Sequence, residues 1–206
     1  MAPSVRESLW KGWGMCERHA WGFISVEAAF RQGYMHGPAI VYLDLMRQAL
    51  RVFAQRNILK GLHEKGPCHM CELGYGPHSK GAARPDILKT GRDLTEIRAF
   101  AKKTSPYWKG AVCGRCAETG SEMRCSRHLM EDLSARKIED LSMHKRLVEY
   151  IVRHITVYAL SFRYEYHGTE TVEDVAALIS AVGWCSGWGR FLEVLHEPKE
   201  QRNESA

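Results

Sequence analysis

The segment from Pro67 to His128 opens with Cys68-His-Met-Cys71, continues to Cys113-Gly-Arg-Cys116 and ends with Cys125-Ser-Arg-His128. In each pair two residues separate two soft donors, so one tight turn can aim both side chains at a single metal ion. A fourth pair, Cys16-Glu-Arg-His19, stands alone near the N-terminus. The spacing predicts that the chain is organised around bound metal.

The four pairs together supply six Cys and two His, the donors that two four-coordinate sites need. The candidate ligands are Cys16, His19, Cys68, Cys71, Cys113, Cys116, Cys125 and His128. Two structural zinc ions are the cofactor that we favour. An iron–sulfur cluster is the alternative, although clusters prefer thiolates and the two His suit closed zinc sites better.

Length and composition predict one mainly α-helical domain. The chain has 206 residues, 45% of them hydrophobic, with six Trp, which is enough for a proper core. No stretch has the alternation of a strand, so we expect a helical bundle with metal-bound Cys/His loops. We place the domain at residues 1–196, with the metal loops at about 62–133 and a disordered polar tail at 197–206.

Helical periodicity and stop signals divide the chain into several segments. The apolar stripe from Tyr42 to Phe53 and the stripe from Leu147 to Phe162 are the clearest. Pro38 is placed at a first helical position, and Thr171 with Asp174 forms a variant capping box. We expect helices at 4–13, 16–30, from 38 to about 57–61, at 90–103 with a stop at Ser105-Pro106, from about 125, at 147–162 and from 172 onward.

The first residues lack the basic-then-apolar pattern of a secretory signal. Six of the seven Cys stand in metal-type pairs, which favours the reducing cytoplasm. The longest apolar run, Val175 to Trp188, is shorter than the roughly 20 residues of a membrane span. We therefore expect a cytoplasmic protein with no membrane span.

Positive charge is concentrated in the basic segment 80–137, which contains 13 Lys and Arg against 7 Asp and Glu, while the whole chain carries a net charge of +5. These cations can offset the negative charge of metal thiolates, which is the explanation that we prefer. The alternative is a surface for nucleic acid or for an acidic protein partner.

The pairs resemble those of a poorly characterised bacterial family of helical proteins. Its modules contain a Cys-Pro-x-Cys pair followed by a helix that starts with Gly-Leu-Cys-x-x-His. Gly14-Met-Cys16-Glu-Arg-His19 and Cys125-Ser-Arg-His128 resemble the helix start, and Cys68-His-Met-Cys71 resembles the first pair without its Pro. The resemblance covers about residues 12–133. It implies a helical fold that binds metal, and no established reaction.

Three combinations of the pairs are open. Module order, which we favour, gives one site from Cys68, Cys71, Cys125 and His128. The other site then consists of Cys16, His19, Cys113 and Cys116. The second unites the two Cys-x-x-Cys pairs and leaves a mixed site of two Cys and two His. The third, which we rank last, closes 113–128 on itself and joins 16/19 to 68/71. The packing of the helices decides among them.

Several function classes compete. A zinc-stabilised scaffold, adaptor or regulatory protein with a protein partner comes first, an iron–sulfur redox protein second, and a metal- or thiol-dependent enzyme third. The chain has no His-Glu-x-x-His, no phosphate-binding Gly loop and no nucleophile elbow, which argues against an enzyme. The seventh Cys, Cys185, lies in a Gly- and Trp-rich run, and we interpret it as a small buried residue rather than a nucleophile.

Overall fold

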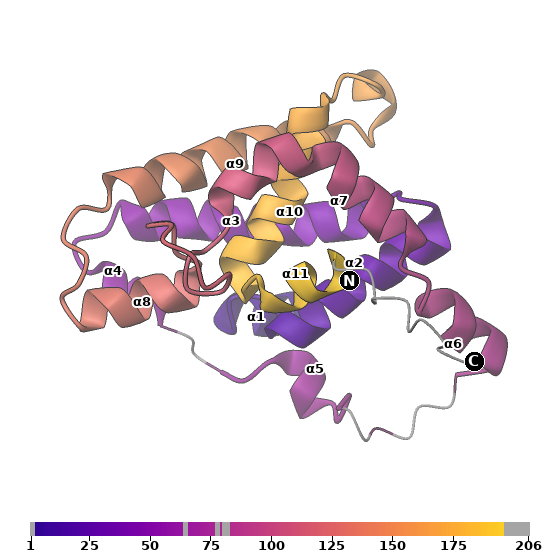
Figure 1. Cartoon of the computed structure of the whole chain (residues 1–206), viewed down its shortest axis with the longest axis horizontal. Helices are drawn as coiled ribbons and strands as arrows, with labels where there is room; N and C mark the ends of the chain where they lie inside the picture. The colour runs from indigo at the N-terminus through magenta and orange to yellow at the C-terminus, as the bar shows by residue number, and fades with distance from the viewer. Residues whose placement is uncertain (1–2, 64–65, 77–78, 80–82, 196–206) are drawn as a thin grey trace, which may run out of the picture.

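The computed structural model describes all residues except 1–2, 64–65, 77–78, 80–82 and 196–206. Within the described residues the chain forms helices and no strand, as predicted (Figure 1). The α-helices are α1 (Pro3–Lys11), α2 (Glu17–Arg31), α3 (His36–Phe53), α4 (Ile58–Leu62), α5 (His69–Glu72), α6 (Pro85–Gly91), α7 (Thr95–Trp108), α8 (Ser126–Ser134), α9 (Ser142–Leu160), α10 (Val172–Ser186) and α11 (Gly189–Leu195), with 3-10 turns at Lys109–Ala111 and Tyr164–Tyr166.

Helix α10 is the centre of the bundle. It is buried on every side from Ala176 to Cys185 and packs against α9, α7, α3, α8 and α2. A helix that is apolar all round belongs inside a protein, which explains why this run lacks an exposed polar face. In Figure 1 it crosses the middle of the molecule between α3, α7 and α9. The other long helices bury one stripe each against it.

The predicted stripes of α3 and α9 face the core. Tyr42, Met46 and Ala49 are fully buried on α3, as are Val148 and Ile151 on α9. The capping box is confirmed as well, because the Thr171 hydroxyl accepts from the Asp174 backbone N–H and Asp174 accepts from that of Thr171. The apolar stripes and the capping box both depend on residues close together in the chain, so they can be predicted from a single sequence.

Several predicted helix boundaries are wrong. Helix α7 begins at Thr95 rather than at 90, and α9 spans Ser142–Leu160 rather than 147–162. The helix that was expected to stop before Ser105-Pro106 instead continues through Pro106 to Trp108, as α7. Pro106 and Lys102 lie on the exposed side, where water can satisfy the carbonyl that proline leaves without a donor. Helix α3 begins at His36, before Pro38, and ends at Phe53. Pro38 lies in its first turn, where its missing N–H costs nothing.

Two Gly- and Trp-rich runs, at residues 10–14 and 183–189, pack together. Trp13 and Trp184 meet edge to face, with ring centroids 6.0 Å apart. The ring of Trp188 lies on Gly183, where an added Cβ would be 2.2 Å from the ring. Gly187, at φ 103°, then ends α10 and turns the chain into α11. The 183–189 run therefore forms the C-terminal end of α10 and the turn into α11.

The expected metal-loop region does not stay outside the core. Within it, α7 contributes the buried side chains Ile97, Ala101 and Trp108. Helix α5, by contrast, has no buried residue and lies at the edge of the molecule in Figure 1. The predicted disordered tail at 197–206 lies outside the described residues.

Candidate metal centres

The eight candidate ligands meet in two groups of three Cys and one His. Cys16, His19, Cys68 and Cys71 form site 1, and Cys113, Cys116, Cys125 and His128 form site 2. In each group the donor atoms all lie within 4.8 Å of one another. Each group can hold a metal ion. Module order and the all-thiolate site are both wrong as pairings, and the combination that we ranked last is the one present.

Both sites contain a Cys-x-x-His pair at the N-terminus of a helix. Cys16 is the N-cap of α2 and Cys125 is the N-cap of α8, both with extended backbone, and the His three residues later returns over the first turn. A thiolate at an N-cap meets the positive end of the helix dipole. The Cys-x-x-His spacing therefore aims a sulfur and an imidazole nitrogen at one point.

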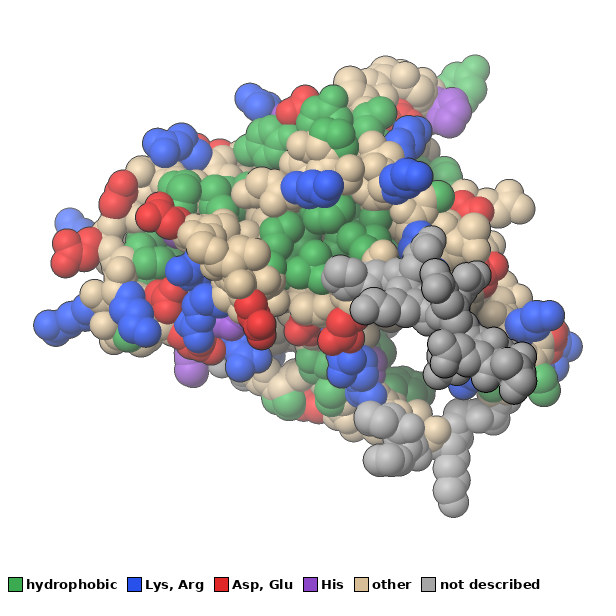
Figure 2. All heavy atoms as spheres, viewed as in Figure 1, with side chains coloured by type: hydrophobic (Ala, Val, Ile, Leu, Met, Phe, Trp, Pro, Cys, Tyr) green, Lys and Arg blue, Asp and Glu red, His purple; other side chains and the backbone are tan. Residues whose placement is uncertain are grey.

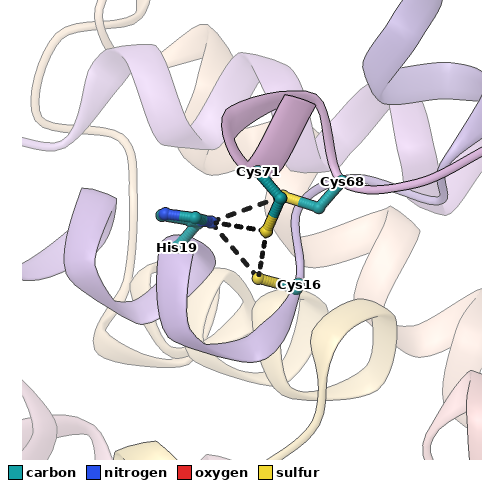
Figure 3. A group of neighbouring side chains, drawn as sticks. All are labelled: Cys16, His19, Cys68 and Cys71. Carbon is teal, nitrogen blue, oxygen red and sulfur yellow. Dashed lines mark hydrogen bonds between the residues drawn. The ribbon is translucent and has the colours of Figure 1, made fainter. Parts of the chain in front are cut away.

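In site 1 the imidazole of His19 faces all three sulfurs (Figure 3). Its Nδ1 lies 3.3 Å from the sulfur of Cys16 and 3.5 Å from those of Cys68 and Cys71. Its Nε2 donates to the carbonyl oxygen of Tyr75, which also accepts from Arg18 at 2.9 Å. That partner places the ring proton on Nε2 and leaves the Nδ1 lone pair for a metal.

Site 2 repeats this geometry deeper in the protein. The Nδ1 of His128 lies 3.2, 3.4 and 3.3 Å from the sulfurs of Cys113, Cys116 and Cys125. Cys113 and Cys125 are buried, whereas Cys71 of site 1 is exposed. The two sites thus share one donor set and differ in their access to solvent.

Which ligand pairs share a site follows from the contacts that close the loop between them. Between the two pairs of site 2, the backbone N–H of Gly114 donates to the carbonyl of Met123 at 2.9 Å, and a Cβ on Gly114 would lie 2.0 Å from the Ser121 oxygen. This tight closure brings Cys116 to Cys125 at the entropic cost of a short loop. Site 1 then takes the remaining pairs, through contacts between α1 and α5.

Several sulfurs of the two sites have shifted pKa values. Hydrogen bonds from the thiols of Cys116 and Cys125 hold the pKa of Cys113 far below its ordinary value. The same hydrogen bonds to Cys113 raise the pKa of Cys116 to about 11 and that of Cys125 higher still. In site 1, burial raises the pKa of Cys16 to about 11. A bound cation would displace the protons that these thiols share.

Two arginines of the basic segment form ion pairs next to the ligands of site 2. Arg115 lies between the first two cysteines and pairs with Asp132 at 2.9 Å and with Glu131 at 2.7 Å. Arg124, which precedes Cys125, donates to the other Asp132 oxygen at 2.6 Å. Asp132 is 4% exposed, and although burial opposes its ionisation, the hydrogen bond from Arg124 and the charge of Arg115 hold its pKa below the ordinary value. One buried carboxylate on α8 therefore ties both halves of the site together.

Cys185 belongs to neither site. It is buried, its sulfur lies 3.8 Å from that of Met46, and burial raises its pKa well above the ordinary value. Its backbone carbonyl accepts from the hydroxyl of Ser126 at 3.1 Å, which links α10 to the start of α8. A packing role fits these contacts, and we expect slow alkylation of this thiol in the native protein.

In the part of the chain that the structure describes, fold and site together define a mainly helical protein with two Cys3His centres. No family model, no curated protein and no solved structure matches this chain, so the resemblance to the bacterial Cys/His family remains an expectation. Within the described residues, no helix is long and apolar enough to cross a membrane.

Proposed function

We propose that the protein is a helical scaffold or adaptor whose fold is held by two structural zinc ions. The observation that carries this proposal is the shape of the donor groups. A tetrahedral zinc with bonds of about 2.3 Å to sulfur and about 2.0 Å to nitrogen separates two sulfurs by about 3.8 Å, and a sulfur from the nitrogen by about 3.5 Å. The measured separations are 3.8 Å for Cys16–Cys71 and Cys116–Cys125, and 3.2–3.5 Å for sulfur to Nδ1.

The same distances favour a single ion over an iron–sulfur cluster. In a cluster the protein ligands are attached to different irons, so their donor atoms spread apart around the cluster. Here each group of four donors converges on one point. Three thiolates with one imidazole are also a frequent structural zinc set.

A scaffold role is favoured over catalysis because each site supplies four protein donors. Catalytic zinc keeps a position open for water or substrate, and a four-donor tetrahedron does not. Zinc at these sites would supply folding energy, because it joins α2 to α5 and the 113–116 turn to α8. The thiolates need a reducing compartment, and we therefore place the protein in the cytoplasm.

A protein is the partner that we propose, and nucleic acid at the basic segment 80–137 is the second candidate. Arg84, Arg115, Arg124 and Arg127 of that segment are each paired with a carboxylate. On the face seen in Figure 2, Lys and Arg are interspersed with Asp and Glu rather than gathered into a stripe. These observations favour a structural use of the charge.

Elemental analysis and zinc X-ray absorption of anaerobically purified protein test the proposal. We expect two zinc ions per chain, each with three sulfur neighbours and one nitrogen neighbour, and a colourless protein. A brown protein with several irons per chain would assign the iron–sulfur alternative. A protein that keeps its fold without any metal would contradict a structural role.

A further inference from the structure

A cationic cavity lies between α1, α3 and α4, outside both metal sites. Its volume is about 430 Å³, within the range of small-ligand pockets. The cavity is lined by Trp10, Lys11, Trp13, Gln48, Arg51, Val52, Gln55, Lys60, Gly61 and His63. None of these residues carries a carboxylate, so the described part of the lining is positive.

Two of the cations have no ion-pair partner among the described residues. Arg51 and Lys60 form no ion pair within the described part of the chain, whereas Lys11 is paired with Glu7 at 2.7 Å. The contrast with the cavity on the other side of Trp10 is informative. That cavity is lined by Arg6 and Asp44, which pair with each other. Of these two cavities, the one between α1, α3 and α4 is therefore the one that holds cations without an ion pair among the described residues.

The fold holds these groups in place. Gly61 lets α4 approach α3 closely, because a Cβ there would lie 2.6 Å from the Val52 side chain. This approach sets Lys60 and His63 beside Arg51 in one lining. The guanidinium of Arg51 in turn lies over the Trp10 ring, 5.0 Å from its centroid, and Trp10 is 41% exposed. A charged group and an exposed aromatic face thus share one site.

We propose that this cavity binds a phosphorylated ligand that carries a planar ring, the chemistry of a free nucleotide. Arg51 and Lys60 would take the phosphate, since guanidinium and ammonium groups both bind it well. Trp10 would take the ring, because any base can stack on an exposed indole. A free nucleotide is favoured over a nucleic-acid strand because the site is a hollow of single-ligand size rather than a long basic track.

Calorimetric titration of the zinc-loaded protein at about 150 mM salt tests this with three probes: inorganic phosphate, AMP and a single-stranded oligonucleotide. We expect AMP to bind about tenfold more tightly than phosphate, the contribution of one stacked base. R51Q and K60Q should each weaken AMP by about tenfold, the value of one charge-assisted hydrogen bond. W10L should weaken AMP to the level of phosphate, and should weaken phosphate by less than AMP, since Arg51 loses only the ring that it lies over.

The control is K145Q, which removes an exposed Lys of α9 that is paired with Glu149. It should bind AMP like the wild type, and circular dichroism should show all four variants folded. Tighter binding of the strand than of AMP would overturn the free nucleotide and assign the site to nucleic acid. Equal binding of AMP and phosphate, no binding of either, or wild-type affinity in R51Q and K60Q would overturn the proposal.

Discussion

At the scale of single residues, Asp132 should stabilise site 2 more than Glu131, the half-exposed carboxylate beside it. Asp132→Asn leaves Arg115 and Arg124 beside a neutral amide in a largely buried setting. Breaking a buried pair costs about 3–5 kcal/mol, and because Arg115 is 39% exposed we expect a smaller loss of about 2–3 kcal/mol. Urea unfolding of the zinc-loaded variant measures this loss.

The matched control for Asp132 is Glu131→Gln, which removes the half-exposed carboxylate on the same helix that also pairs with Arg115. Solvent screens this pair, so the loss should stay below about 1 kcal/mol. Equal destabilisation of the two variants would contradict the view that Asp132 is the carboxylate that ties site 2 together.

Gly183 and Gly22 give opposite expectations for the same substitution. Both lie inside helices, where Ala is favoured over Gly by about 1 kcal/mol. An added Cβ on Gly22 meets nothing within 4 Å, so Gly22→Ala should stabilise the protein by about 1 kcal/mol. On Gly183 the Cβ would lie 2.2 Å from the Trp188 ring, and overpacking of about 3 kcal/mol outweighs the helical gain.

Thermal melts of the two Gly variants at the same zinc loading measure the difference. The melting temperature should rise for Gly22→Ala and fall for Gly183→Ala. A rise for both would mean that Trp188 moves aside at little cost, and that the contact between ring and backbone does not hold the end of α10.

At the scale of elements, the start of α10 is a pH-dependent junction with α9. Asp174 accepts from Thr171 and lies 2.7 Å from Nδ1 of His154 on α9. Burial opposes its ionisation, but the hydrogen bonds from Thr171 and His154 hold the pKa of Asp174 below the ordinary 3.8. A carboxylate with a lowered folded pKa stabilises the protein above its unfolded pKa. That stability is lost as pH falls through the folded value.

Asp174→Asn should therefore cost about 1–2 kcal/mol at neutral pH, the value of a helix cap with its partner. The difference in unfolding free energy between wild type and variant should shrink below about pH 4. Taking the difference removes any loss of bound metal in acid, which would be the same for both proteins. Glu149→Gln, on an exposed pair of α9, is the control and should show neither effect. A difference that is constant with pH would rule out Asp174 as the titrating group.

At the scale of the whole molecule, the helical class and the stripes of α3 and α9 could be predicted because periodicity is a local property of the chain. The eight clustered residues could also be selected from their spacing. The pairing could not, because Cys16 and Cys71 are 55 residues apart and meet only through the packing of α1, α2 and α5. The closure of site 2 is the exception, because only eight residues, Gly120 among them, separate Cys116 from Cys125, and such a short loop costs little entropy to close.

The cationic cavity could not be predicted from the sequence either, because it too depends on how the helices pack. Its cations lie outside the basic segment, in a part of the chain whose net charge is slightly negative. Arg51 and Lys60 come together only because Gly61 lets α4 close on α3. Charge counted along a chain does not show where charge gathers in space.

The two metal sites should release their metal in a fixed order, because they differ in burial. Site 1 includes the exposed Cys71 and rests on α5, a four-residue helix on the connection at the edge of the molecule. Site 2 includes Cys113 at 0% and Cys125 at 2% exposure, in contact with the central helix through Ser126. A chelator should therefore remove one zinc quickly with little change in helix content. The second should leave only with global unfolding, because local opening needs less free energy than opening the core.

Cys71→Ser and Cys125→Ser, which remove the same ligand type from matched sites, separate these roles. Cys71→Ser should bind one zinc by native mass spectrometry and melt within a few degrees of the wild type, since α5 contributes no buried side chain. Cys125→Ser should lose the stable fold, because it leaves a defective site inside the core. Equal release rates, or equal destabilisation by the two variants, would show that burial does not rank the sites and that α5 belongs to the cooperative core.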